Sequence, residues 1–198
     1  MKSVLNIAIR YTMVTTLLLG VAYPLLVTGL AQLTMRRQAD GQLIVRDGQV
    51  IGSAIIGQSF TSGRYFHGRP SAAGNGYDAT NSGGSNYGPT NRKLIDRIDT
   101  DVAALQKQNP GKPVPIGLVT TSASGLDPDI SPAGALYQVP RVAAARHLPE
   151  PAVRALVERH IEGRQFGFLG EPRVNVLELN LDLDRGSGEQ QAATSGQR

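Results

Sequence analysis

The 198-residue chain contains no cysteine and no tryptophan, and its first acidic residue is Asp40. Without cysteine the chain has no disulfide, no thiolate zinc site and no thiol nucleophile. Only 18% of the residues are charged, which is below the roughly 25% of an average soluble protein. This shortage is concentrated before Arg36, where Lys2 and Arg10 are the only charged side chains. The amino-terminal part of the chain therefore differs in kind from the rest.

The net charge of +4 does not indicate a surface for nucleic acid. When Lys2 and Arg10 are set aside, 18 basic residues remain against 16 acidic ones, and the two signs are interspersed. Binding to nucleic acid requires lysine and arginine gathered on one face. We therefore expect no nucleic-acid partner.

A transmembrane helix is predicted for residues 11–35, which are uncharged and lie between Arg10 and the pair Arg36 and Arg37. As a helix this stretch extends about 37 Å at about 1.5 Å per residue, more than the roughly 30 Å hydrocarbon core of a bilayer. Pro24 should kink the helix, because proline removes one backbone hydrogen bond. A cleaved signal peptide is the alternative, but its apolar core is usually shorter and no small-residue cleavage site precedes the arginines.

The flanking charges leave the orientation of this helix undecided, because both ends are basic. The short tail of residues 1–10 favours insertion with the following domain outside the cytoplasm. The predicted topology is a single membrane crossing, with the soluble domain outside the cytoplasm.

The rest of the chain is divided into a soluble domain, residues 36–184, and a tail, residues 185–198. The tail consists mostly of Gly, Ser, Gln and Ala and has no core-forming residue, so it is predicted to be disordered. In some segments of the domain apolar residues recur at the three-to-four-residue spacing of a helix, and in others they alternate with polar residues as in a strand. The predicted fold class is therefore α+β: a single N-terminal transmembrane helix followed by one mixed α+β extracytoplasmic domain.

Local patterns place the elements of that domain. Asp47-Gly48 between two apolar runs predicts a β-hairpin. Helical spacing and capping residues predict helices, and short apolar or alternating runs predict strands. The helices are expected over residues 90–107, on either side of Pro140 as two short segments, and over 148–163; the strands are expected over 115–121 and 174–183.

Two loops carry the polar side chains of interest. Residues 62–89 are rich in Gly, Ser and Asn but contain four aromatic residues, so we expect a long, ordered loop. Ser82-Gly83-Gly84-Ser85-Asn86 within it is either a nest of backbone N–H groups for phosphate or an ordinary glycine turn. Arg69 either docks a carboxylate of a partner or ties its own loop.

The second loop, residues 122–129, holds Asp127 and Asp129 on either side of a proline. These carboxylates either bind a cation together or cap a turn. Ser122 and Ser124 lack the Gly-x-Ser-x-Gly pattern of a nucleophile. The three histidines have no ligand at metal-binding spacing, so no catalytic residue and no metal ligand is assigned.

Several blocks of sequence resemble the C subunit of the bacterial Kdp potassium-transporting P-type ATPase. They are Tyr23-Pro24, residues 56–60, residues 65–72, Ser82-Gly83-Gly84-Ser85-Asn86, residues 124–132, residues 138–143 and residues 170–180. The blocks follow one another in order from about Lys2 to Asp184. The long ones, such as Ser124-Gly125-Leu126-Asp127-Pro128-Asp129-Ile130-Ser131-Pro132, make the resemblance specific.

The resemblance implies a non-catalytic accessory subunit of a high-affinity, ATP-driven potassium uptake complex. It also implies a location in the cell inner membrane, crossed once, with a periplasmic soluble domain. Its implied partners are a channel-like potassium-binding subunit, a P-type ATP-hydrolysing subunit and the lipid bilayer. It further implies support of assembly and a role as a catalytic chaperone that raises the ATP affinity of the hydrolysing subunit. Ser82, Gly83, Gly84 and Ser85 would then be the nucleotide contact, with ATP shared rather than tightly bound, and Arg69, Asp127 and Asp129 are the candidate partner contacts.

The residues alone also allow a membrane-anchored periplasmic binding module or hydrolase unrelated to transport. A hydrolase needs a base near Ser122 or Ser124, and no His or Lys is close to either in sequence. A binding module would function without other membrane subunits. Neighbouring genes for a P-type ATPase and a multi-span channel protein distinguish these alternatives from the transport complex.

Overall fold

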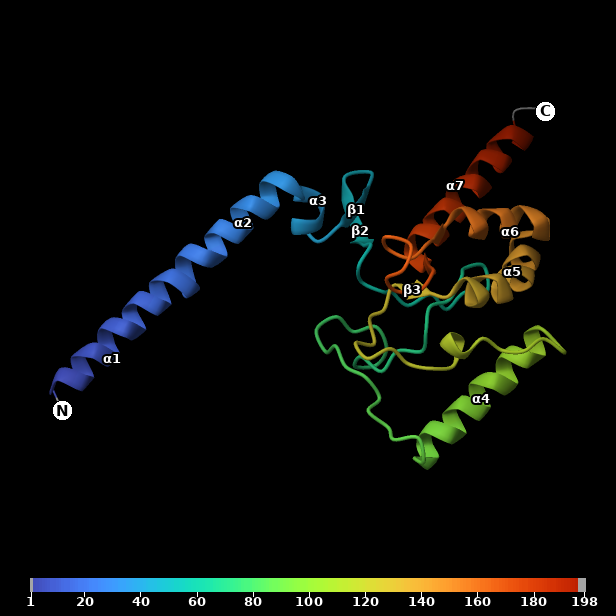
Figure 1. The fold of residues 1–198 in the computed structure, drawn as a ribbon. Helices are drawn as coiled ribbons and strands as arrows, with labels where there is room; N and C mark the ends of the chain where they lie inside the picture. The colour runs from blue at the N-terminus through green and yellow to red at the C-terminus, as the bar shows by residue number, and fades with distance from the viewer. Residues whose placement is uncertain (1, 196–198) are drawn as a thin grey trace. The chain divides into compact units, whose positions relative to one another are not determined.

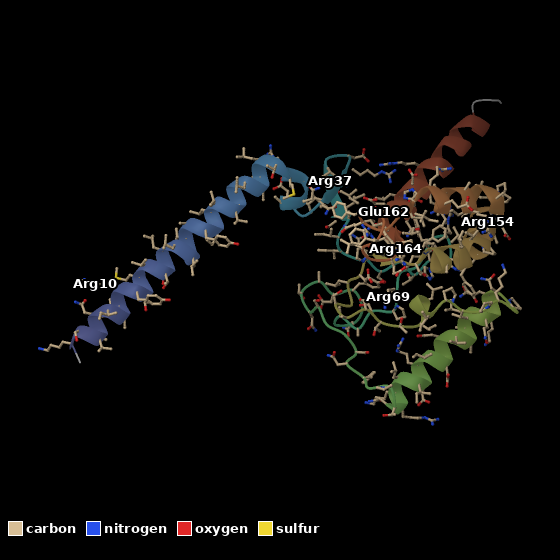
Figure 2. The ribbon with its side chains drawn as sticks, viewed as in Figure 1. Arg10, Arg37, Arg69, Arg154, Glu162 and Arg164 are labelled. Atoms are coloured by element: carbon tan, nitrogen blue, oxygen red, sulfur yellow. The ribbon has the colours of Figure 1, made fainter. Side chains whose placement is uncertain are left out.

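The computed structural model describes residues 2–195 and divides into two compact units, Met1–Ser53 and Ala54–Arg198. The first unit begins with one long helical stretch, coloured blue in Figure 1. It consists of α1 (Lys2–Thr15), the π-helix η1 (Thr16–Ala22) and α2 (Tyr23–Thr34). None of their side chains is buried, and they extend outward around the helix in Figure 2.

The stretch Lys2–Thr34 is long and apolar enough to cross a membrane, judged by length and composition alone. The π-helix lies immediately before Pro24, where the sequence predicts a disturbance. Proline has no N–H to donate, and the N–H of Tyr23 donates to the carbonyl of Leu18, five residues back. Local widening to π geometry is a common way for a helix to accommodate such a break.

The short helix α3 (Arg36–Ala39) leads into a two-stranded sheet, β1 (Leu43–Arg46) and β2 (Gln49–Ser53). Asp47 and Gly48 have φ angles of 51° and 77°, positive at both central positions as in a type I′ turn. The strands are antiparallel with Val45 opposite Val50. The hairpin predicted from Asp47-Gly48 is confirmed.

The second unit mixes helices with a small sheet, so the α+β prediction is confirmed. Its elements in chain order are α4 (Arg92–Gln108), η2 (Ile116–Leu118), β3 (Asp129–Ile130), α5 (Pro132–Arg146), α6 (Glu150–Arg159), β4 (Ile161–Glu162), β5 (Arg173–Asn175) and α7 (Val176–Ser195). The sheet is antiparallel with the order β3-β5-β4. Helices α5, α6 and α7 lie side by side in Figure 1.

One apolar core holds this unit together. It lies where α5, α6 and α7 meet β5 and one residue of the long loop, Phe66. The fully buried side chains with the largest volumes are Phe66, Leu179, Val139, Val142, Val153, Val157, Val174 and Asn180. Burying a side chain of this size contributes about 1.5–3 kcal/mol. The core therefore fixes Phe66, and with it the loop, against three helices.

The strand predicted over residues 174–183 is wrong beyond Asn175, because α7 begins at Val176. The alternating leucines suggested a period of two. The buried residues Val176, Leu179, Asn180 and Leu183 instead follow the i, i+3, i+4, i+7 spacing of a helix. Asn175 begins this helix by accepting the N–H of Glu178 at 3.1 Å.

The helix α7 continues to Ser195, beyond residue 185, where the predicted disordered tail starts. Residues 185–195 of the predicted tail are therefore helical in the structure. Residues 196–198, which the prediction also covers, lie outside the described residues.

Two further predictions are corrected. The strand predicted over residues 115–121 is absent: Pro115 is extended, but Ile116–Leu118 form the single turn η2, which the N–H of Val119 closes on the carbonyl of Ile116. Pro140 does not split α5 into two helices. Proline inside a helix costs about 3 kcal/mol, but Val139 and Val142 on either side are fully buried in the same core, which offsets that cost.

Candidate functional site

The predicted contact residues lie in or beside two loops of the second unit. We call residues 54–91 the first loop and residues 119–128 the second loop. Neither loop contains a helix or strand, and backbone hydrogen bonds join them: Gly57 N–H donates to the Leu126 carbonyl at 2.8 Å, and Gly83 N–H to the Ser124 carbonyl at 2.9 Å. The two loops thus form one paired surface, which confirms that the first loop is ordered.

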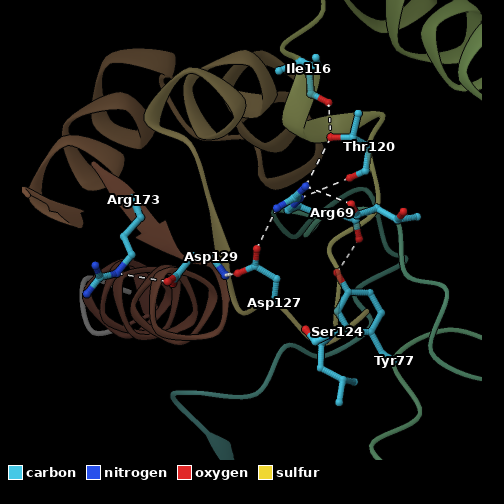
Figure 3. A network of polar contacts seen from close by, with 10 residues as sticks. Arg69, Tyr77, Ile116, Thr120, Ser124, Asp127, Asp129 and Arg173 are labelled. Atoms are coloured by element: carbon cyan, nitrogen blue, oxygen red, sulfur yellow. Dashed lines mark hydrogen bonds and ion pairs between the residues drawn. The ribbon is translucent and has the colours of Figure 1, made fainter. Parts of the chain in front are cut away.

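Arg69 of the first loop binds the second loop through its guanidinium group. Nη1 donates to Oδ2 of Asp127 at 3.0 Å, Nε to the Thr120 carbonyl at 3.3 Å, and Nη2 to the Thr121 carbonyl at 3.2 Å (Figure 3). Both charged side chains are about 70% covered, with exposed fractions of 27% and 30%. Arg69 therefore ties its own loop to the second loop, which is one of the two roles that the sequence left open.

Asp127 and Asp129 point toward different arginines, as Figure 3 shows. Asp127 Oδ1 accepts the backbone N–H of Asp129 at 3.0 Å, a turn-capping contact. Asp129 Oδ2 pairs with Arg173 Nε at 3.2 Å, and Arg173 Nη2 continues to Glu162 at 2.6 Å. The two carboxylates therefore do not converge on one cation.

The environment of Asp129 disfavours its charged form. Burial raises the pKa of the Asp129 carboxyl above its usual range, and the negative charges of Asp127 and Glu162 add to that effect. Arg173 acts in the opposite direction but does not cancel it. Asp129 is thus a carboxyl whose protonation is made easier by the fold.

Tyr77 closes the first loop on itself beside this network. Its hydroxyl donates to the carbonyl of Arg69 at 2.7 Å. Burial raises the pKa of Tyr77 to about 12, and the charge of Asp127 contributes to that rise. Tyr77 therefore acts as a neutral hydrogen-bond donor that fixes the backbone carrying Arg69.

Two glycines allow the loops to approach this closely. A β-carbon at Gly57 would lie 2.5 Å from the carbonyl oxygen of Asp127, and one at Gly125 would lie 2.7 Å from the backbone of Ala73 and Gly83. Gly125 also has a φ of +67°, in the left-handed region that favours glycine.

The segment Ser82–Ser85 uses its polar groups to pair with the second loop. Ser82 Oγ and Gly83 N–H both donate to the Ser124 carbonyl at 2.9 Å, and Ser85 Oγ lies 3.2 Å from the hydroxyl oxygen of Thr121. Gly83 and Gly84 do not have a positive φ, whereas Asn86 has a φ of 52°. The contacts of Ser82–Ser85 are those of a glycine turn packed on the second loop.

The serines of the second loop also serve the local structure. Ser124 Oγ accepts the N–H of Leu126 at 3.1 Å, and Ser122 is buried. Neither hydroxyl pairs with an imidazole or amine within the described residues. The arrangement provides structure rather than nucleophilic chemistry.

Sequence reasoning missed the carboxamides that hold the first loop. Asn180 of α7 accepts the N–H of Phe66 at 2.8 Å and donates to the Phe66 carbonyl at 2.9 Å. Gln138 of α5 does the same for His67, at 2.8 Å and 3.0 Å. Each carboxamide thus makes the two hydrogen bonds that the backbone of a neighbouring β-strand would make. The sequence signal that could have found Gln138 and Asn180 is a polar residue at a position where the apolar pattern of the helix predicts burial.

Two arginines of α5 hold the preceding part of the loop. Arg141 donates to the carbonyls of Gly63 at 2.6 Å and Tyr65 at 3.0 Å. The side chain of Arg146 is only 3% exposed; it pairs with Asp184 at 2.7 Å and lies over the ring of Tyr65 at 4.8 Å. The first loop is therefore clamped to the helices on one side and to the second loop on the other.

A cleft of about 280 Å³ lies beside this clamp, lined by residues of the first loop, α4 and α5 that include His67, Asp101, Leu105 and Arg141. Burial lowers the pKa of His67, and the positive charge of Arg141 adds to that effect. His67 Nε2 lies 2.9 Å from the Ser62 carbonyl. The imidazole is therefore held neutral near pH 7.

Comparison with known proteins gives a consistent result over more than nine tenths of the chain. The family model described as the c chain of the K+-transporting ATPase matches residues 5–185. The chain is 62% identical over 184 residues to the potassium-transporting ATPase KdpC subunit of Koribacter versatilis, covering 93% of this chain and 95% of that one. The proteins of the same description from Acidobacterium capsulatum and Bradyrhizobium diazoefficiens are 59% and 54% identical, over 91% and 92% of this chain and 97% and 96% of theirs.

Proposed function

The chain belongs to the family of the C chain of the K+-transporting ATPase, and on that premise we propose that it acts by binding its partner subunits, without chemistry of its own. The proposed complex is the high-affinity, ATP-driven potassium uptake system. Its other members are a channel-like potassium-binding subunit and a P-type subunit that hydrolyses ATP. The observation that carries the proposal is the family match over residues 5–185.

The contacts within the two loops support a binding role. Arg69, Asp127 and the backbone of Ser82–Ser85 are used to hold the loops in one shape, so they present a preorganised surface. A surface that is rigid before binding loses less conformational entropy when a partner docks. Partner contacts then come from the outer edges of these loops, where residues such as Tyr87 are exposed.

The proposed location is the cell inner membrane, with Lys2–Thr34 crossing the bilayer once and the second unit on the periplasmic side. The length and apolar character of that helix support the crossing.

The finer part of the proposal is the chaperone role, in which the subunit raises the ATP affinity of the hydrolysing subunit. We place the origin of this effect in subunit contacts, since Gly83 N–H already donates to Ser124 and is not free for phosphate. Measuring the ATP KM of the complex with and without this subunit tests the role. Ser82→Ala and Ser85→Ala test direct contact, and a raised KM with unchanged assembly would favour nucleotide contact at Ser82–Ser85.

The experiment for the function as a whole is affinity purification of the full chain in mild detergent. Recovery of a P-type ATPase and a multi-span channel protein with it is the expected result. Recovery of the chain alone from cells that express those proteins contradicts the proposal and favours a solitary anchored binding module. ATP hydrolysis by the purified chain alone would favour the hydrolase alternative.

A further inference from the structure

The segment between β4 and β5 carries the most exposed aromatic side chains of the second unit. Phe166 is 87% exposed, Phe168 is 70% exposed and Leu169 is 47% exposed. Large apolar side chains gathered in this way on a soluble surface usually mark an interaction site. We call residues 164–171 the Phe hairpin.

The Phe hairpin has a defined conformation. Gln165 and Leu169 form an antiparallel bridge, with reciprocal backbone hydrogen bonds of 2.9 Å. The N–H of Phe168 donates to the Gln165 carbonyl at 3.2 Å. At the base, Arg164 binds both carboxylate oxygens of Glu171, at 2.8 Å and 2.7 Å. The apolar side chains are therefore presented by a closed turn rather than by a loose loop.

The turn also holds Phe166 in an unfavourable backbone conformation. Phe166 and Gly167 have φ angles of 53° and 82°, the pattern of a type I′ turn, in which Asn, Asp or Gly is preferred at the first central position. A phenylalanine there is both strained and exposed to water. Strain of this kind persists mainly where a site has a function.

We propose that the Phe hairpin inserts its tip into the headgroup region of the bilayer that holds the N-terminal helix. This inference rests on the proposed membrane crossing. The helix ends at Thr34 and the second unit begins at Ala54, so about 20 residues tether this unit to the membrane. A tether of that length keeps the local concentration of bilayer surface high, and a weak apolar insertion is then sufficient.

The chemistry of the tip favours lipid over a protein pocket. Protein interfaces usually carry about one hydrogen bond for each 100–200 Å², but the Phe hairpin has few polar side chains with which a protein partner could form hydrogen bonds. Arg164 and Glu171 bind each other, and the tip itself consists of Phe166, Gly167 and Phe168. Insertion of aromatic and leucine side chains at the boundary of headgroups and acyl chains needs no directional partner.

The absence of tryptophan from the chain gives a clean test. The full-length Phe166→Trp variant is reconstituted into vesicles of phosphatidylcholine and phosphatidylglycerol that carry spin-labelled lipids, and flotation first checks that the protein is in the membrane. The matched control is Ile116→Trp, which replaces another large apolar side chain, 76% exposed, in the same unit.

The expected result is a blue-shifted emission for Phe166→Trp, quenched by labels near the headgroup, while Ile116→Trp emits as in water. In a Phe168→Trp reporter, the added change Phe166→Asn, which suits the turn, should reduce the quenching by lipid labels. Floating protein with a water-like Phe166→Trp spectrum overturns the inference but not the membrane crossing. If the indole is shielded only after the other subunits are added, membrane insertion is wrong and the hairpin contacts a protein. If the protein does not float with the vesicles, the proposed membrane crossing is wrong, and the inference fails with it.

Discussion

Asn180 exchanges two hydrogen bonds with the backbone of Phe66, across 114 positions of sequence. Both groups are buried: Asn180 is 1% exposed and Phe66 is 0% exposed. The carboxamide therefore gives a loop residue the pairing that a β-sheet would give it, while the phenyl ring fills the core between the helices. This pair links the fold of the helices to the shape of the first loop.

Replacing Asn180 with leucine should destabilise the second unit by about 2–4 kcal/mol, because a buried N–H and a buried carbonyl of Phe66 lose their partners. The free energy of unfolding, followed by tyrosine fluorescence in urea, measures the effect. Asn81→Leu is the matched control, since Asn81 is exposed and should change stability by less than about 0.5 kcal/mol. Equal effects of the two variants would contradict this account.

Asn180 also shows why sequence reasoning reached only part of the fold. Elements defined by local signals were predicted correctly: the hairpin at Asp47-Gly48 and the helix expected over residues 90–107, which is α4 (Arg92–Gln108) in the structure. The start of α5 is also local, because Ser131 Oγ accepts the N–H of Gly134 at 3.1 Å. Such turns and caps depend on a few adjacent residues. Residues 176–183 fit both an alternating and a helical pattern, and the choice between them depends on packing against Phe66 and α5, which is not local.

The same distinction applies to the candidate site. Arg69, Asp127 and Asp129 were identified by type and by position in loops. For Arg69 the alternatives were a partner contact and an internal tie, and for the two carboxylates they were a cation site and a turn cap. The internal ties depend on which segments lie together after folding. Arg69 and Asp127 are separated by 58 positions, so no local pattern pairs them.

The Arg69–Asp127 ion pair should show energetic coupling in a double-mutant cycle. Arg69→Ala and Asp127→Ala each remove one partner of a mostly covered pair, so the double variant should cost less than the sum of the two by about 0.5–3 kcal/mol. The exposed pair Arg92–Asp96 of α4 is the control, with an expected coupling of about 0.3–0.5 kcal/mol. Urea unfolding of the four variants of each cycle gives both values.

This cycle also has a functional readout. Because the pair fixes the shape of the paired loops, either single alanine should reduce recovery of the complex and its potassium-stimulated ATPase activity together. Ser124→Ala should leave both nearly unchanged, since its hydroxyl only caps the N–H of Leu126. An assembled complex without ATPase activity in Ser124→Ala would contradict a purely binding role.

Stability should fall as the pH is lowered from 7 toward 5, in part because of His67. Burial lowers the pKa of His67 in the folded state from the usual 6.5, so the unfolded chain takes up a proton first. The stabilising contribution is present above the unfolded pKa and is lost as the pH falls toward the folded one. His67→Gln should flatten the profile of unfolding free energy between pH 7 and 5, and an unchanged slope in that variant would contradict this account.

Labelling of a new cysteine tests the proposed periplasmic side. Gly88→Cys adds a thiol to a cysteine-free chain, at an exposed position where a β-carbon has no neighbour within 4 Å. A membrane-impermeant maleimide should modify it in intact cells. Modification only after lysis would place the domain in the cytoplasm and bring Ser82–Ser85 within reach of ATP.

A charge in the middle of the N-terminal helix should prevent stable insertion. Leu18→Arg places a guanidinium near the centre of Lys2–Thr34 and should cost about 2.5–3.5 kcal/mol of insertion free energy. Thr34→Arg, at the end of the helix, should cost much less, because the side chain reaches the interface. The fraction of protein retained in membranes after a carbonate wash measures both. Leu18→Arg should lower that fraction and separate the protein from its complex, and equal retention of the two variants would mean that Lys2–Thr34 does not cross the bilayer.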